Sequence, residues 1–197
     1  MLNAKSLIAT SVAESIATKL KLLAEQSEQI EKSGQLLAGV YEKGGKILFC
    51  GNGGSAADCQ HIAAELVIRF RSKINRAALP AIALTVDPSM MSAGGNDIGF
   101  ENVFARLVEA YGKSGDALVA ISTSGNSENV IRAVNTAKQQ GVLTIGLLGG
   151  SGGKLLPLCD HSVVVPSEVT ARIQESHILI GHVWCEIIEE TIFPELF

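Results

Sequence analysis

Short apolar runs alternate with helix-length segments over most of the chain, and this alternation constrains the fold more than any other feature. Five runs are apolar at nearly every position: 47–50, 81–84, 117–121, 142–148 and 162–165. Strands without a polar face are buried on both sides, which is typical of parallel strands covered by helices. We therefore predict an α/β fold, a three-layer αβα sandwich with a five-stranded parallel sheet.

The helix-length segments lie between and around these runs, at 55–70, 99–111, 126–140 and 169–192. The first forty residues are also helical in pattern. Apolar residues recur every four positions from Ile8 to Leu20, and a second amphipathic stretch runs from Ile30 to Tyr41 before Gly44 ends it. The pattern predicts a two-helix N-terminal extension.

The 197 residues fit one domain, 1–197, because no linker-like or low-complexity segment divides them. We expect residues 1–43 to form the helical extension and residues 44–197 the αβα core. Hydrophobic residues make up 47% and charged residues 18%, which excludes a disordered chain. A surface with so little charge indicates contact with further subunits, and we expect the extension to serve oligomerisation.

Composition also excludes several functions. The net charge is −4 and no run of Lys and Arg stands out, so we expect no nucleic-acid partner. The four cysteines are far apart and form no C-x-x-C pair, which fits a reducing compartment. No apolar run approaches the roughly 18 residues of a membrane span. We expect a cytoplasmic protein without a membrane partner.

The first candidate site is the loop 51–58, Gly-Asn-Gly-Gly-Ser-Ala-Ala-Asp, directly after the first apolar run. Ligands bind at the carboxyl ends of parallel strands, and glycines let the backbone approach an anion at the next helix N-terminus. A dinucleotide site and a simple tight turn are the alternatives. The acidic ribose ligand that a dinucleotide site needs about 20 residues later is missing.

The second candidate site is the loop 121–127, Ile-Ser-Thr-Ser-Gly-Asn-Ser, which opens a helix. Four hydroxyls and a glycine at a helix N-terminus suit a phosphate monoester. A helix cap with spare serines is the alternative, although one hydroxyl is enough for a cap. No Gly-Lys-Ser/Thr follows, which excludes a nucleotide P-loop.

Two helices add groups capable of acid–base chemistry. His61 and Glu65 are four residues apart on one helix face, with Arg69 continuing the row; a solvated pair is the alternative. In the last helix, His182 lies among apolar residues, where a buried core histidine is the alternative. Gln174 lies eight residues earlier, roughly 12 Å along the helix, so the two side chains either reach one ligand from both ends or serve different subunits.

A further polar pair, Asn96-Asp97, follows the second apolar run. A turn with capping side chains explains this pair, and contacts to sugar hydroxyls are the other interpretation.

Together these segments resemble the sugar isomerase (SIS) domain family and, within it, the bacterial phosphoheptose isomerases. The resemblance covers almost the whole chain and rests on four motifs in the expected order, at 50–65, 95–100, 121–127 and 172–182. It implies an isomerase that interconverts sedoheptulose 7-phosphate and D-glycero-D-manno-heptose 7-phosphate, the first step toward the heptose of the lipopolysaccharide core. It also implies a homotetramer with active sites at subunit interfaces.

By matching position, the resemblance implies the following substrate contacts: Asn52, Gly53, Gly54, Glu65, Asn96, Asp97, Ser122, Thr123, Ser124, Ser127 and Gln174. To these we add Ser55 of the glycine loop and Arg69 of the His–Glu row. The resemblance further implies a zinc ion, held by His61, Glu65, Gln174 and His182. No nucleotide cofactor is expected.

Aldose–ketose isomerisation moves a proton between adjacent carbons through an enediol, so it needs a base and a proton donor for oxygen. Glu65 is the candidate base and His182 the candidate acid. A non-catalytic relative of the same fold, a tetramer that binds the DnaA replication initiator, is the alternative. Its tail resembles Ile192-Phe193-Pro194, but it lacks acid–base groups at the positions of Glu65 and His182. A SIS protein acting on amino-sugar phosphates is a third option.

Overall fold

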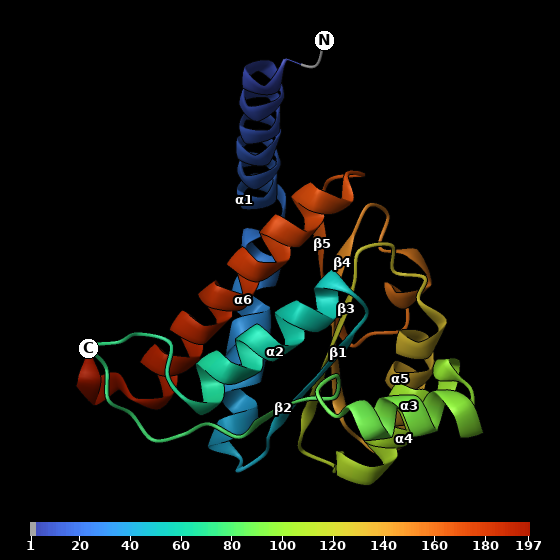
Figure 1. Ribbon diagram of the computed structural model, residues 1–197. Helices are drawn as coiled ribbons and strands as arrows, with labels where there is room; N and C mark the ends of the chain where they lie inside the picture. The colour runs from blue at the N-terminus through green and yellow to red at the C-terminus, as the bar shows by residue number, and fades with distance from the viewer. Residues whose placement is uncertain (1–2) are drawn as a thin grey trace.

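The computed structural model describes residues 3–197, which form one sheet and the helices around it (Figure 1). In chain order the elements are α1 (Ala4–Glu42), β1 (Ile47–Gly51), α2 (Gly54–Val67), β2 (Ala81–Ala83), α3 (Pro88–Asp97), α4 (Phe100–Tyr111), β3 (Ala117–Ser122), α5 (Glu128–Gln139), β4 (Leu143–Gly149), η1 (Gly153–Leu155), β5 (His161–Val165), α6 (Thr170–Ile192) and η2 (Pro194–Leu196).

The sheet has five parallel strands in the order β2-β1-β3-β4-β5, as predicted from the apolar runs. The chain passes from β1 to β2 on one side and then crosses to β3 on the other. This reversal creates a topological switch point between β1 and β3, where Gly51 pairs with Ile121. The glycine loop and the serine loop leave the sheet at this point.

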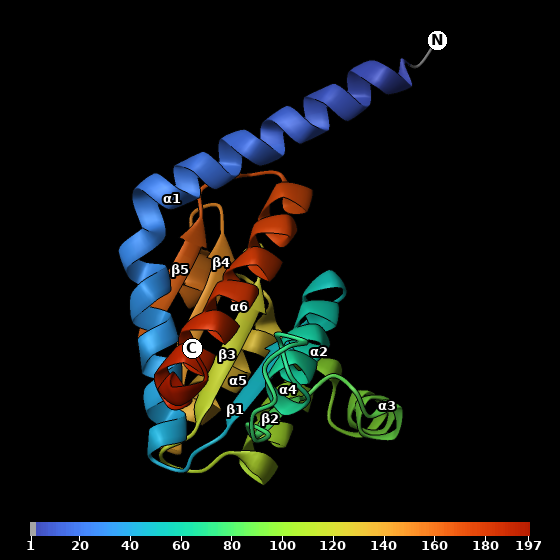
Figure 2. The same cartoon turned by 90° about the vertical axis from the view of Figure 1, so that its left-hand side faces the viewer.

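Helices cover both faces of the sheet. One face packs against α1, α2 and α6, and its core includes Phe49, Val119 and Trp184. The other face packs against α4 and α5 through Leu118 and Val134. Figure 2 shows α6 lying across the first face, with α1 and α2 on either side of it. The three-layer prediction is confirmed.

The N-terminal extension is one continuous helix of 39 residues, so the prediction of two helices is wrong. Figure 2 shows that α1 bends partway along its length without being interrupted. No proline or glycine lies between Leu20 and Ile30, and the backbone has no local reason to break. The apolar spacing changes because the second half packs on α6 and β5, whereas the first half projects beyond the sheet.

Helix α3 was also not expected from the apolar pattern. It contains no buried residue, so no amphipathic period marks it. Its start does carry a signal: the Asp87 side chain accepts a hydrogen bond from the Met90 N–H, and Pro88 takes the first helical position. A capping pattern alone identifies this helix.

Helix α1 approaches α6 closely at Gly34. A Cβ atom placed on Gly34 would lie 2.7 Å from Cδ1 and 3.1 Å from Cβ of Ile187. At Gly39, one turn and a half further on, a Cβ would meet only a Glu42 oxygen at 3.9 Å. The crossing of α1 over α6 therefore requires a glycine at 34 and not at 39.

His177 connects α6 to the sheet through a hydrogen bond. Its imidazole is buried, and Nε2 lies 3.0 Å from the Leu148 carbonyl oxygen at the end of β4, to which the ring N–H donates. The other ring nitrogen, Nδ1, has no hydrogen-bond partner among the described residues. Burial lowers the His177 pKa from 6.5 to about 4, against the smaller raising effect of the Leu148 hydrogen bond. The histidine is therefore a neutral structural group at neutral pH.

We predict that Gly34→Leu lowers the free energy of unfolding by about 1–3 kcal/mol, because the added side chain forces α1 away from α6. Gly39→Leu is the matched control and should be neutral or slightly stabilising, since Leu favours a helix more than Gly does. Urea denaturation followed by circular dichroism measures both. Equal stability of the two variants would contradict the close approach at Gly34.

We also predict that His177 makes the protein sensitive to acid. Because its pKa is lower in the folded than in the unfolded chain, the unfolded chain binds the extra proton first as the pH falls. The contribution of the neutral His177 to the free energy of unfolding is therefore fully present above pH 6.5. It is lost as the pH falls from 6.5 to about 4, and it amounts to on the order of 3 kcal/mol. His177→Gln should flatten this slope in denaturation series at several pH values. An unchanged slope would show that other groups cause it.

Candidate functional site

The two loops at the switch point are joined by a pair of side-chain amides. Asn52 Nδ2 donates to Asn129 Oδ1 over 2.8 Å, and Asn129 Nδ2 donates back to Asn52 Oδ1 over 2.9 Å. Asn129 is buried in the first turn of α5, whereas Asn52 follows β1. This reciprocal pair holds the glycine loop beside the serine loop, so both face one site.

The serine loop presents hydroxyls that do not cap the helix behind it. Ser127 occupies the N-cap position of α5, but its side chain makes no capping hydrogen bond. Its Oγ instead lies 3.1 Å from Oγ of the buried Ser122. Thr123 is half-buried and Ser124 is exposed. The arrangement favours the anion cradle over a simple helix cap.

The turn of this loop depends on Gly125, which has a φ of 64° and packs against the Gly152 backbone. A side chain there would overlap the Gly152 carbonyl. Only glycine meets both conditions, and it brings the hydroxyls of the loop together over the helix N-terminus.

Helices α2 and α6 lie side by side and run in the same direction, and they carry most of the remaining candidates. Near their starts, the Gln174 amide lies directly on Gly54, where any side chain would collide with it. About two turns later, the Ile62 side chain packs on Gly181, where an added Cβ would overlap Ile62 Cδ1. The two helices are thus in register at 54 with 174 and at 62 with 181.

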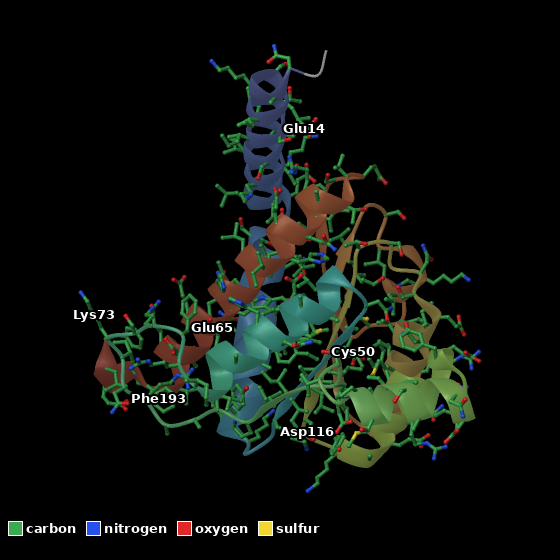
Figure 3. The ribbon with its side chains drawn as sticks, viewed as in Figure 1. Glu14, Cys50, Glu65, Lys73, Asp116 and Phe193 are labelled. Atoms are coloured by element: carbon green, nitrogen blue, oxygen red, sulfur yellow. The ribbon has the colours of Figure 1, made fainter. Side chains whose placement is uncertain are left out.

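This register brings His61, Glu65 and His182 together. The two imidazole Nε2 atoms are 2.9 Å apart, so one ring donates a hydrogen bond to the other. His61 Nε2 is also 3.3 Å from a Glu65 carboxylate oxygen. The Glu65 side chain is 23% exposed and points toward α6 (Figure 3). His182 is therefore part of a polar cluster open to solvent and is not a buried core histidine.

Three expected site residues, Arg69, Asn96 and Asp97, make no contact with the two loops or with the histidine cluster among the interactions of the described residues. Arg69 does not continue the helical row, because α2 ends at Val67 and Arg69 follows in an exposed segment. Asn96 and Asp97 lie at the end of α3 rather than in a turn, both exposed, where Asn96 Nδ2 donates to Asp97 Oδ1 over 2.7 Å. Gln174 lies against Gly54, near the glycine loop, and Ser55 is buried under it.

Sequence reasoning did not assign roles to Asp58, Phe70 or Asn129, which the structure places in or around the site. Asp58 lies one turn before His61; burial raises its pKa, and nearby His61 opposes this. The Phe70 ring lies 5.3 Å from the His182 ring, centroid to centroid. The three-residue spacing of Asp58 from His61 is a signal that the sequence carries. Phe70 and Asn129 carry no such signal, because they reach His182 and Asn52 only through tertiary contacts.

The donor types at the cluster fit zinc, which takes imidazole and carboxylate ligands at about 2.0–2.2 Å. Among residues 3–197, no group of three or more His, Cys, Asp and Glu side chains already has a metal-holding arrangement. The imidazoles hydrogen-bond each other directly, and two ligands of a tetrahedral ion lie about 3.3 Å apart. A small separation of the rings from 2.9 Å would therefore admit a metal between them.

The chain matches the model of the SIS domain family over residues 12–149. A phosphoheptose isomerase of Clostridium acetobutylicum is 50% identical over 193 residues, which cover 97% of both chains.

Two solved structures share the fold over nearly their entire length. The phosphoheptose isomerase of Neisseria gonorrhoeae is 43% identical, with a TM-score of 0.89 and coverage of 95% of this chain and 100% of that one. The one from Francisella tularensis is 38% identical, with a TM-score of 0.92 and coverage of 96% and 100%.

Proposed function

The chain belongs to the SIS domain family, and we infer that it is a phosphoheptose isomerase, which converts sedoheptulose 7-phosphate to D-glycero-D-manno-heptose 7-phosphate. The observation that carries this conclusion is the match at 50% identity over 97% of both chains to a phosphoheptose isomerase. The enzyme is an aldose–ketose isomerase, and the contact of His61 with Glu65 and His182 supplies the groups that this reaction needs.

We propose that Glu65 and His182 are the acid–base pair. In the ketose-to-aldose direction the Glu65 carboxylate takes a proton from C1 while His182 gives a proton to the C2 oxygen, which yields the enediol. Glu65 then returns its proton to C2, and His182 recovers one from the C1 hydroxyl as the aldehyde forms. His61 contacts both residues, so it holds them in mutual orientation.

The substrate phosphate is proposed to bind the serine loop through Ser122, Thr123, Ser124 and Ser127. Support comes from the N-terminus of α5, where the Ser127 side chain makes no capping hydrogen bond and its Oγ lies 3.1 Å from the Ser122 Oγ. Anchoring the far end of the sugar there converts binding energy into orientation at C1 and C2. Asn52, Gly53 and Gly54 lie beside the cradle and are the proposed contacts to the rest of the sugar.

The alternative of a non-catalytic tetramer that binds the DnaA initiator is not favoured. The chain retains both Glu65 and His182, and the structure brings each into contact with His61. A scaffold has no chemical use for this arrangement.

Zinc is the proposed metal, held by His61, Glu65 and His182. Gln174, the fourth ligand that the resemblance implies, lies against Gly54, about 12 Å before His182 along α6. A zinc ion there would polarise the substrate carbonyl. Support comes from the meeting of two imidazoles and a carboxylate, and from the small separation that would open a space between the rings.

The protein is proposed to be a homotetramer assembled through α1. The projecting half of this helix carries a stripe of exposed apolar residues, Ile8, Val12, Ile16, Leu20 and Leu23. The stripe continues into an apolar groove of about 280 Å³ between α1 and α6, which Leu179 and Val183 line. An apolar surface of this extent is typical of a subunit interface.

The proposed place of the reaction is the cytoplasm, at the first step toward the heptose of the lipopolysaccharide core. No helix in residues 3–197 is long and apolar enough to span a membrane. The four cysteines are free thiols, in keeping with a reducing compartment. Recovery of the protein with the membrane fraction of cells would contradict this location.

We expect Glu65→Gln and His182→Gln each to lower kcat by about 10²–10⁴-fold, because each removes a proton-transfer group. The assay follows sedoheptulose 7-phosphate by NMR in deuterated water, where wild-type turnover also places deuterium at C2. His161→Gln, on β5, is the matched control and should retain activity. A folded wild type that converts no substrate, with or without zinc, would exclude the isomerase.

We expect zinc to raise the melting temperature of the wild type and of His161→Gln. It should leave the melting temperatures of His61→Gln and His182→Gln unchanged, because these variants lack a proposed ligand. Equal responses of all four proteins would exclude this zinc site.

We expect Ile16→Glu combined with Leu20→Glu to dissociate the oligomer, because two charges then enter an apolar interface. Glu25→Lys, on the opposite side of α1, is the control and should leave the mass unchanged. Sedimentation equilibrium measures both masses. A monomeric wild type would contradict the tetramer.

A further inference from the structure

A buried ion pair joins the loop after α2 to the last turns of α6. Arg76 lies in the segment between α2 and β2, and its side chain and that of Glu189 are both fully buried. Arg76 Nε donates to Glu189 Oε1 over 2.7 Å. The Phe193 ring, which follows the end of α6 (Figure 3), has its centroid 6.0 Å from the Arg76 guanidinium carbon.

The other two guanidinium nitrogens of Arg76 donate hydrogen bonds to the end of α2. Nη2 donates to the Glu65 carbonyl oxygen over 2.7 Å, and Nη1 donates to the Leu66 carbonyl oxygen over 2.8 Å. Carbonyls in the last turn of a helix have no partner within it, and a cation is favourable at that end. Arg76 therefore fixes the backbone of Glu65, the proposed catalytic base.

Glu189 connects the same ion pair to His182. The two residues are seven apart on α6, so they share a face and lie about 10 Å from each other along the helix. Glu189 Oε1 also accepts a hydrogen bond of 3.4 Å from the Phe70 N–H. The Phe70 ring in turn lies 5.3 Å from the His182 ring. The Glu189 carboxylate thus contacts Glu65 through Arg76 and His182 through Phe70.

Burying two opposite charges is costly, and an apolar pair of similar size often packs as well. The planar fork of Arg offers what an apolar pair lacks, because it binds a carboxylate and two carbonyls at fixed angles. We propose that Arg76, held by Glu189, is a positioning residue that sets the relative placement of Glu65 and His182. The consequence for catalysis rests on the proposed function, whereas the structural consequence does not.

The experiment compares Arg76→Lys with Asp116→Asn. Lys keeps the charge of Arg76, but its single nitrogen cannot occupy the three separate positions from which Nε, Nη1 and Nη2 donate to Glu189 and the two carbonyls. Asp116 is the matched control, since it is a buried carboxylate paired with Lys46 at the amino ends of the strands, and it also accepts hydrogen bonds from backbone N–H groups. Both variants should lower the melting temperature.

Two readouts separate positioning from stability. The first is kcat and KM for sedoheptulose 7-phosphate, well below the melting temperature. The second is the ¹H–¹⁵N spectrum of the imidazoles, which shows His61 and His182 together with the internal references His161 and His177, the chain's four histidines. The spectrum needs no turnover, so it tests the placement of the rings even if the wild type proves inactive.

We expect Arg76→Lys to lower kcat by about 10–100-fold with KM within about threefold, and to shift the His61 and His182 signals only. Asp116→Asn should leave kcat and all four signals unchanged. Wild-type kcat and unshifted His61 and His182 signals in folded Arg76→Lys would overturn the proposal, as would equal losses in both variants. If Arg76→Lys does not fold, Arg76→Met with Glu189→Leu replaces it, with the same expected loss and the same overturning result.

Discussion

The close parallel packing of α2 against α6 is the contact on which the rest of the site depends. Two glycines permit it: Gly54 leaves room for the Gln174 amide, and Gly181 admits the Ile62 side chain. Neither helix carries a complete set of chemical groups, since Glu65 and His61 belong to α2 and His182 to α6. Separating the helices by one side chain would end the imidazole contact, because a hydrogen bond does not tolerate such a displacement.

The sheet decides where the two candidate loops lie. Strand order places the switch point between β1 and β3, and both loops that leave the sheet there are held together by the amides of Asn52 and Asn129. The proposed phosphate cradle lies at the carboxyl ends of β1 and β3, whereas the proposed acid–base cluster lies further along α2 and α6. Such a division suits a reaction in which one end of the sugar is anchored and the other is transformed.

Errors in the sequence interpretation have identifiable physical causes. The prediction of two N-terminal helices took a change in apolar spacing for a break, although the change reflects what α1 packs against. Helix α3 was missed because it buries nothing. Arg69 was placed on a helix row that ends two residues earlier, at a boundary where Arg76, from a later loop, occupies the last carbonyls.

The sequence by itself determined the parallel sheet, the positions of the two loops and the His61–Glu65 spacing, because periodicity and glycine placement are local properties. It also singled out His182 and Gln174 on the last helix, and the resemblance to a family gave them their expected roles. Only the tertiary structure decided that His182 contacts His61, that Gln174 lies on Gly54 and that Arg76 is buried against Glu189. The residues of each pair are more than a hundred positions apart in the chain, and only the packing of helices on the sheet brings them together.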